Sequence, residues 1–214
     1  MAHIVETVGG LRFSKTARAA YQYCNVTFTL VGHIVSVLSG MPFADFVKER
    51  ILKPLGMTHT TWTLPKAGTR VVNGYLTTWD RDRLKQQLPL PCIGLDEDNF
   101  NAASGSMLST AADMAKWLAF LLRLAGNKAT PDELRILKPE TMKEIVRSRV
   151  IADQQIGALP VQAGKSLWEE MAVPTYALAQ LRSSYRGIDI CSHNGRYCSH
   201  LRSIPSRFPQ SDRY

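Results

Sequence analysis

Two short groups of residues, far apart in the chain, combine side chains that can move protons with side chains that can hold a polar substrate. Tyr23 and Asn25 stand two apart before an apolar stretch, and His193 and Gly195 stand two apart near the C-terminus. A tyrosine moves protons at neutral pH only where nearby cations favour its phenolate. An asparagine amide both donates and accepts, a histidine donates to an anion or carbonyl oxygen, and a glycine after a strand lets a ligand approach the backbone. Taken alone, the first group is better explained as a helix start and the second as an ordinary polar turn.

A second arrangement near the C-terminus consists of two C-x-H pairs. Cys191 with His193 and Cys198 with His200 place four zinc-type ligands within ten residues. Residues two apart on a strand point to the same face, so each pair has the geometry to reach one ion. The C-x-H gap is shorter than the gap of about two to four residues in structural zinc sites. A zinc-binding module is therefore the less favoured alternative, and we predict no metal and no cofactor.

The charge of the chain does not predict a nucleic-acid-binding surface. The formal net charge is +8, but basic residues are interspersed with acidic ones over most of the chain, and the excess of arginine lies towards the C-terminus. A surface that stacks bases needs basic residues alternating with aromatic ones, and the sequence has no such stripe. We therefore expect a solvated basic surface and no nucleic-acid partner.

Cysteine spacing and hydropathy indicate the compartment. No apolar run is long enough to cross a bilayer, and the N-terminus lacks the basic region and apolar core of a secretion signal. The four cysteines form no C-x-x-C pair and no dense framework, which fits the reduced thiols of an intracellular protein. The sequence favours a cytoplasmic location without a membrane partner.

Helical periodicity dominates the chain up to about residue 150. Apolar residues spaced i, i+3, i+4 and i+7 predict an amphipathic helix over 26–39, which Gly40 ends; they are Val31, Ile34, Val35 and Leu38. A second helix opens at Pro42 and continues to residue 53. Weak periodicity and turn residues over 57–100 predict loops with short strands.

Capping residues mark the later helices. Thr110 and Asp113 have the spacing of a capping box before a helix over 110–125. The apolar face expected for that helix comprises Met114, Trp117, Leu118, Leu121 and Leu122. Thr130, followed by a proline and by the acid Glu133 at capping-box spacing, starts another helix, and a third follows Pro139.

From residue 175 the pattern changes from helix to strand. The segments TYALAQL and GIDICSH, joined by RSSYR, predict an antiparallel hairpin over 175–192. The chain is therefore expected to be one α+β domain. It would have a mainly helical and loop region over 1–150, and a hairpin with an irregular basic tail over 175–214.

Taken in order, these segments resemble the serine β-lactamase-like family, which includes class C β-lactamases, D-alanyl-D-alanine carboxypeptidases and related esterases. The matching text is YQYCNVTFTLVGHIVSVLSGMPFADFVKERILKPLGMTHTTW, then AASGSMLSTAADMAKWLAFLL, then SSYRGIDICSHNG. The resemblance implies a helical lobe with a partial antiparallel sheet of the β-lactamase/transpeptidase-like fold. It also implies acyl-enzyme hydrolysis of an amide, lactam or ester, with a small molecule, peptide or ester as substrate.

The resemblance implies a role for each polar group. In this family the serine of an S-x-x-K motif attacks the acyl carbon, and its lysine and the Y-x-N tyrosine manage the serine's proton. Tyr23 and Asn25 match the tyrosine and asparagine, and His193 and Gly195 match the outer positions of the K-T-G-like strand motif in an H-x-G form. Tyr23 and His193 are thus predicted catalytic residues, and Asn25 and Gly195 predicted substrate-binding residues. We expect them in one cleft between the two lobes.

The nucleophile of this family is missing from the sequence. No serine stands three residues before any lysine, and only 22 residues precede Tyr23, where the family carries that motif. After Gly195 the chain is arginine-rich, whereas the family has a segment of small residues that includes glycine. We interpret the chain as an incomplete β-lactamase-related domain that is inactive alone and self-associates through an open sheet edge. The alternative is a non-catalytic binding protein that retains the family's pocket.

Overall fold

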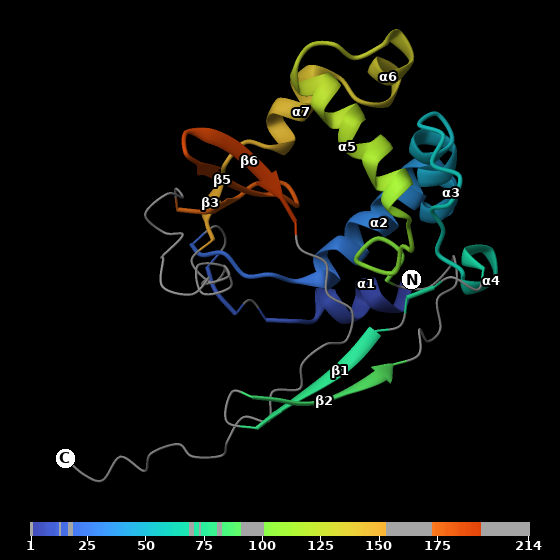
Figure 1. The fold of residues 1–214 in the computed structure, drawn as a ribbon. Helices are drawn as coiled ribbons and strands as arrows, with labels where there is room; N and C mark the ends of the chain where they lie inside the picture. Colours follow the sequence, from blue (N-terminus) through green and yellow to red (C-terminus); the bar gives the residue numbers. More distant parts are fainter. Residues whose placement is uncertain are drawn as a thin grey trace.

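The chain folds into a group of helices and two antiparallel sheets (Figure 1). The computed structural model describes residues 2–12, 14–16, 19–68, 71–72, 74–80, 83–90, 101–152 and 173–193. The architecture is α+β, as the sequence predicts. The basic tail predicted after the hairpin lies outside the described residues.

Four helical segments make up the N-terminal part: α1 (Ala2–Gly9), α2 (Asn25–Ser39), α3 (Phe43–Val47) and the π-helical segment η1 (Lys48–Leu52). Gly40 ends α2 with a φ of 68°, a left-handed conformation that glycine adopts without steric cost. Both helices predicted for this part of the chain are confirmed, whereas α1 was not predicted. No single described helix is long and apolar enough to span a bilayer; α2 and α3–η1 reach that length and composition together, but they are bent by 76°.

The remaining helices are α4 (Leu64–Ala67), α5 (Ala111–Ala125), α6 (Pro131–Ile136) and α7 (Pro139–Ile145). Thr130 and Glu133 form the capping box predicted at the start of α6, because each side chain accepts a hydrogen bond from the other's backbone N–H. At the start of α5 only half of that pattern is present. The Thr110 hydroxyl accepts from the Asp113 N–H, but the Asp113 carboxylate is used elsewhere.

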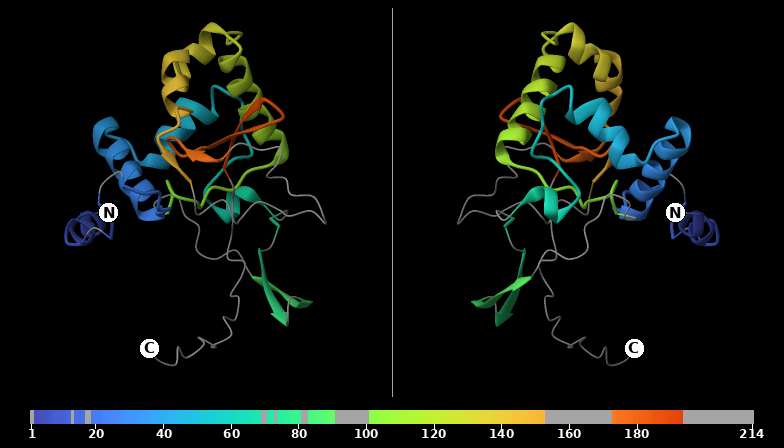
Figure 2. Two further views of the ribbon diagram at one scale, coloured as in Figure 1. Left: turned by 90° about the vertical axis from the view of Figure 1, so that its left-hand side faces the viewer. Right: turned by 90° about the vertical axis from the view of Figure 1, so that its right-hand side faces the viewer.

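The strands form two separate antiparallel sheets. The first is the hairpin of β1 (Gly74–Asp80) and β2 (Arg83–Leu90), which stands away from the helices in Figure 2. The second has the order β3-β4-β5-β6. Its strands are β3 (Val150–Ile151), β4 (Thr175–Tyr176), β5 (Leu181–Tyr185) and β6 (Ile188–Ser192). The strands predicted within 57–100 are therefore present, but they are longer than expected, at seven and eight residues.

The C-terminal hairpin was predicted with the wrong connection. The segment RSSYR was assigned to the turn, but most of it is strand β5, and the chain reverses at Arg186 and Gly187. These two residues have φ values of 50° and 80°, as a two-residue hairpin turn requires. Thr175 and Tyr176 belong to a further strand that pairs with the far end of β5. The observed unit is thus a meander rather than a single hairpin.

The core beside α2 is built around Trp62, which is fully buried. Its indole N–H donates to the Ala102 carbonyl at 2.8 Å, and its ring meets Phe43 edge-on at 6.4 Å. This hydrogen bond ties the segment after η1 to the loop that precedes α5. The other buried members of the cluster are Ala44, Val47, Leu52 and Met57.

A buried carboxylate fixes the start of α5. Asp113 is fully buried and accepts hydrogen bonds from the His59 N–H at 2.8 Å, the Thr60 hydroxyl at 2.9 Å and the Lys116 ammonium at 2.9 Å. Burial raises the pKa of Asp113, but the hydrogen bonds from Lys116, His59 and Thr60 outweigh it and bring the pKa below its ordinary value. The carboxylate therefore stays charged and holds the 59–61 segment against α5.

The apolar stripe of α2 does not face the core as predicted. Its buried positions are Thr29 and Gly32, which lie against the turn containing Ala103 and Ser104; the Thr29 hydroxyl donates to the Ser104 hydroxyl at 3.2 Å. The predicted face points outward, with Val31, Ile34 and Leu38 exposed. Because Gly32 and Ala103 are small, the turn before α5 can approach α2 closely. The side of α2 that is covered is therefore the one with Thr29 and Gly32, and not the apolar stripe.

The predicted face of α5 is likewise only partly covered. Met114, Leu118 and Leu122 are exposed. Phe120 and Leu124 are the buried apolar residues of this helix, and Trp117 packs against the core cluster of Trp62.

Candidate active site

Tyr23 and Asn25 lie at the start of α2, with the backbone extended at Cys24 between them. The Thr27 hydroxyl donates to the Cys24 carbonyl at 2.7 Å and the Thr29 hydroxyl donates to the Asn25 carbonyl at 3.3 Å. These hydrogen bonds hold the backbone at the start of α2 and do not involve the side chains of Tyr23 or Asn25. Both side chains are exposed, and Tyr23 keeps 45% of its surface accessible. Within the described part of the chain, the Asn25 side chain makes no hydrogen bond.

His193 follows β6, and the fold brings its ring beside that of Tyr23. The two ring centroids are 6.1 Å apart, with the planes inclined by 44°. The start of α2 and the end of β6 therefore meet, although they lie at opposite ends of the sequence (Figure 1). The proximity predicted for these two residues is confirmed, whereas a catalytic role for either one stays a prediction.

Two further tyrosines, which the sequence analysis missed, complete this cluster. Tyr176 of β4 has its ring centroid 6.4 Å from that of His193, and its hydroxyl lies 3.4 Å from His193 Nε2. On its other side, Tyr176 packs on the buried Tyr21 at 4.7 Å. The spacing of Tyr21 and Tyr23 could have predicted that Tyr21 lies beside Tyr23, because residues two apart in extended backbone point to the same side. No signal in the sequence pointed to Tyr176.

The cluster favours the neutral phenol at its centre. Burial raises the pKa of Tyr176 to about 12, and the neighbouring Tyr21 and Tyr23 add to the shift because nearby phenolates repel one another. Tyr176 therefore keeps its proton throughout the neutral range. It contributes a hydroxyl donor next to His193 rather than a base.

The other predicted site residues have less structural support. Gly195 lies outside the described residues, as do Cys198 and His200 of the C-x-H pairs. Among the residues that the structure describes, no group of three or more histidine, cysteine or acidic side chains has the arrangement to hold a metal ion. The substrate-binding roles of Asn25 and Gly195 thus stay predictions.

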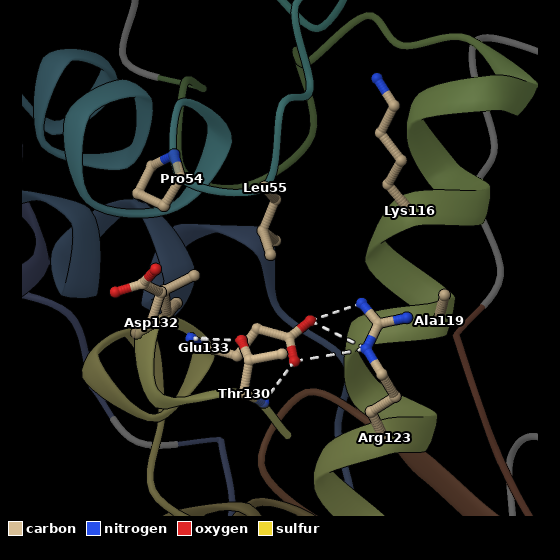
Figure 3. A pocket seen from close by; sticks show the side chains of 9 residues that line it. Pro54, Leu55, Lys116, Ala119, Arg123, Thr130, Asp132 and Glu133 are labelled. Atoms are coloured by element: carbon tan, nitrogen blue, oxygen red, sulfur yellow. Dashed lines mark hydrogen bonds and ion pairs between the residues drawn. The ribbon is translucent and has the colours of Figure 1, made fainter. Parts of the chain in front are cut away.

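A separate pocket of about 370 Å³ lies between the loop after η1, α5 and α6, and shares no residue with the aromatic cluster (Figure 3). Its charged groups are paired. The Arg123 guanidinium donates to the Glu133 carboxylate, and Lys116 donates to Asp113 and to the Gly56 carbonyl. Pairing of this kind joins α5 to its neighbours.

An α+β fold in which the Y-x-N tyrosine beside a helix start lies next to the H-x-G histidine beside a strand end agrees with the resemblance to the serine β-lactamase-like family. The chain belongs to the Beta-lactamase family, whose model matches residues 2–197. The resemblance drawn from the sequence is thereby confirmed, and with it membership of a hydrolase family.

Curated relatives are considerably longer than this chain. "Unguisins hydrolase ungD'" of Aspergillus campestris is 28% identical over 195 residues, which are 90% of this chain and 32% of that protein. "Protein Rv1367c" of Mycobacterium tuberculosis is 29% identical over 151 residues, 68% of this chain and 36% of that protein. The chain thus spans about a third of the length of these relatives.

Solved structures share the fold. A penicillin-binding protein homologue from Pyrococcus abyssi superposes with a TM-score of 0.58 and 21% identity, covering 84% of this chain and 35% of that one. The D-amino acid amidase of Ochrobactrum anthropi gives 0.53 and 22%, covering 83% and 44%. At these identities the likeness defines the fold and not the substrate.

Proposed function

We propose that this chain carries the substrate-facing half of an acyl-transfer site, which acts on an amide, lactam or ester, and that it performs no turnover alone. The observation that carries the proposal is the proximity of the Tyr23 and His193 rings, whose centroids are 6.1 Å apart, in a chain of the Beta-lactamase family. A substrate bridging both side chains needs them within a few ångströms of its reacting atoms.

The family's reaction gives each residue a defined task. A serine Oγ bonds to the acyl carbon, the C–N or C–O bond of the substrate breaks, and the serine proton passes to the leaving group. Tyr23 would relay that proton, and His193 would donate a hydrogen bond to an anionic or carbonyl group of the substrate. The exposed Asn25 amide would bind the substrate's own amide.

The absence of an S-x-x-K serine from the sequence supports the second part of the proposal. Removing the nucleophile from such a site leaves only the residual contributions of binding and oxyanion stabilisation. The chain would then bind substrates without forming an acyl-enzyme. A non-catalytic binding protein with this pocket would share that behaviour, and it is the second candidate.

Labelling and binding test the two parts separately. A fluorophosphonate probe, which phosphonylates an active serine with loss of fluoride, should leave the purified chain unlabelled, and stoichiometric labelling would refute the absence of a nucleophile. Benzylpenicillin, D-phenylalanine amide and phenyl acetate represent the lactam, amide and ester classes. At least one of them should shift the NMR signals of the Tyr23 and His193 rings.

Matched variants give the binding test its control. Tyr23→Phe and His193→Ala should weaken the observed binding, whereas Tyr75→Phe should not, because Tyr75 is 44% exposed, like Tyr23, but lies in β1. Loss of binding in all three variants, or no binding by the unaltered chain, would contradict the proposal. An in-frame S-x-x-K in the transcript upstream of Met1 would favour the enzyme over the binding protein.

A further inference from the structure

We infer that Tyr176 is a positioning residue of this site, whose hydroxyl donates a hydrogen bond to Nε2 of His193 and so fixes the imidazole in the tautomer that carries its proton on Nδ1. The distance between the two atoms is 3.4 Å. A neutral imidazole donates from one nitrogen and accepts at the other. Nδ1 then becomes the donor nitrogen of the neutral ring.

Tyr176 is held in place by its strand and by the ring beneath it. Its carbonyl accepts from the Arg149 N–H at 3.0 Å, and its strand pairs with β3 on one side and β5 on the other. Its ring rests on Tyr21, which is only 5% exposed, at a centroid distance of 4.7 Å. His193, in contrast, is exposed and stands just beyond the end of β6. A phenol held in this way offers the imidazole of His193 a partner in a fixed position.

The hydrogen bond is assigned this direction because a phenol O–H is a stronger donor than an imidazole N–H, and an unprotonated imidazole nitrogen is a stronger acceptor than a phenol oxygen. Because burial and the neighbouring tyrosines keep the Tyr176 hydroxyl protonated well above neutral pH, a donor is always present opposite Nε2. The opposite arrangement, in which Nε2–H donates to the phenol oxygen, would leave Nδ1 as an acceptor. That arrangement would remove the donor that the proposed function assigns to His193.

The hydrogen bond between Tyr176 and His193 also determines how the imidazole faces Tyr23. The ring of His193 lies between two tyrosines, with centroids 6.1 Å from Tyr23 and 6.4 Å from Tyr176. A hydrogen bond on the Tyr176 side sets the angle that the imidazole presents on the Tyr23 side. The inference rests on the proposed function only in assigning the oriented ring to a substrate.

The tautomer is measurable by long-range ¹H–¹⁵N correlation spectroscopy of the histidine rings, recorded in mildly alkaline buffer where imidazoles are neutral. The signals of His193 are assigned by their loss in His193→Gln. In the unaltered chain, Nε2 should have the shift of an unprotonated, hydrogen-bonded nitrogen and Nδ1 that of a protonated one. A protonated Nε2 in the unaltered chain would overturn the inference without any variant of Tyr176.

Tyr176→Phe removes the hydroxyl and keeps the ring on Tyr21. The His193 signals should then lose their preference for the Nδ1–H tautomer, whereas Tyr185→Phe, a matched change in the neighbouring strand β5, should leave them in place. Unmoved His193 signals in Tyr176→Phe would refute the positioning role. Because this readout needs neither substrate nor nucleophile, the positioning role can fail while the chain still binds a substrate through Tyr23 and Asn25, and the binding tests can fail while the tautomer is as inferred.

Discussion

Gly32 of α2 lies directly against Ala103 in the loop that precedes α5, since a β-carbon added to Gly32 would stand 2.4 Å from the β-carbon of Ala103. Carbon atoms do not approach so closely, so the glycine is required by the packing of these two segments. The hydrogen bond from Thr29 to Ser104 belongs to the same contact. This contact fixes α2, and with it the position of Tyr23 at its start.

The change Gly32→Ala is therefore expected to lower the free energy of unfolding by roughly 1–2 kcal/mol. Overpacking costs about 1–3 kcal/mol, and a clash with a neighbouring β-carbon lies in the upper part of that range; the gain of about 1 kcal/mol that alanine has over glycine inside a helix offsets only part of it. Urea denaturation measures the difference. Gly105→Ala, where the added β-carbon meets open space, should change stability by less than about 0.5 kcal/mol. A Gly32→Ala chain as stable as the unaltered one would contradict the close contact.

Asp113 supplies a second test of the same region. All three of its side-chain partners, His59, Thr60 and Lys116, are donors. In Asp113→Asn the new amide would present its own N–H groups to some of these donors. The change should therefore cost roughly 2–3 kcal/mol of unfolding free energy, because buried donors are left unsatisfied. Thermal and urea unfolding of the variant measure this cost.

The control for this change is Asp132→Asn in α6. Asp132 pairs with Arg135, and both side chains are more than 80% exposed (84% and 83%). Exposed pairs of this kind contribute little, so the control should lose less than about 0.5 kcal/mol. Equal losses in the two variants would show that the buried network does not anchor α5.

The pair of Arg123 and Glu133 predicts a pH dependence of stability. Hydrogen bonds from the Arg123 guanidinium and the Thr130 N–H lower the pKa of Glu133 from 4.5 to about 2. A carboxyl with a depressed pKa in the folded state stabilises the protein above its unfolded pKa and loses that contribution as the pH falls through the folded pKa. The stabilisation should therefore be complete above pH 4.5 and be lost between there and about pH 2.

In Glu133→Gln the free energy of unfolding should fall less steeply as the pH is lowered over that range, when it is measured at successive pH values. Because the Arg123 side chain is 44% exposed, solvent screens the pair, and we expect a difference of about 1 kcal/mol or less. Glu140→Gln changes an exposed position in the first turn of α7. Its free energy of unfolding should depend on pH over this range as that of the unaltered chain does. Identical profiles for Glu133→Gln and the unaltered chain would contradict the prediction.

Local rules were sufficient where a feature depends on neighbouring residues. The capping box of Thr130 and Glu133, the stop at Gly40 and the start of α5 at Thr110 were all predicted, because each depends on contacts within a few residues. The family resemblance supplied the meeting of Tyr23 with His193, which no local pattern contains.

Features set by tertiary contacts were missed for identifiable reasons. The turn at Arg186 and Gly187 was misplaced because an arginine at positive φ is not a turn signal. Tyr176 was missed because β4 has only two residues and its alternation cannot be read without knowing its partner strand. The burial of Asp113 was missed because two of its three partners, His59 and Thr60, lie more than 50 residues away.

The outward stripe of α2 leads to the last prediction. Val31, Ile34 and Leu38 have the spacing of a helix face that packs against something, yet they are 53%, 53% and 82% exposed. Together with the unpaired edge that β6 presents within the described part of the sheet, this face should make the chain self-associate, because open edges and apolar faces pair with other chains. Analytical ultracentrifugation over a range of concentrations should show dimers or larger species.

Leu38→Lys should weaken this association, because the lysine replaces the most exposed apolar side chain of the stripe, at 82%, with a charge. Val72→Lys is the matched control, since Val72 is 85% exposed but lies between α4 and β1. If the association depends on the α2 face, the control should associate like the unaltered chain while Leu38→Lys shifts towards monomer. If both variants associate equally, the β6 edge is the contact, and Cys191→Pro should then reduce the association, because alternate N–H groups of an edge strand point outward and proline removes one of them. A chain that is monomeric at every concentration would show that neither surface pairs with a second copy.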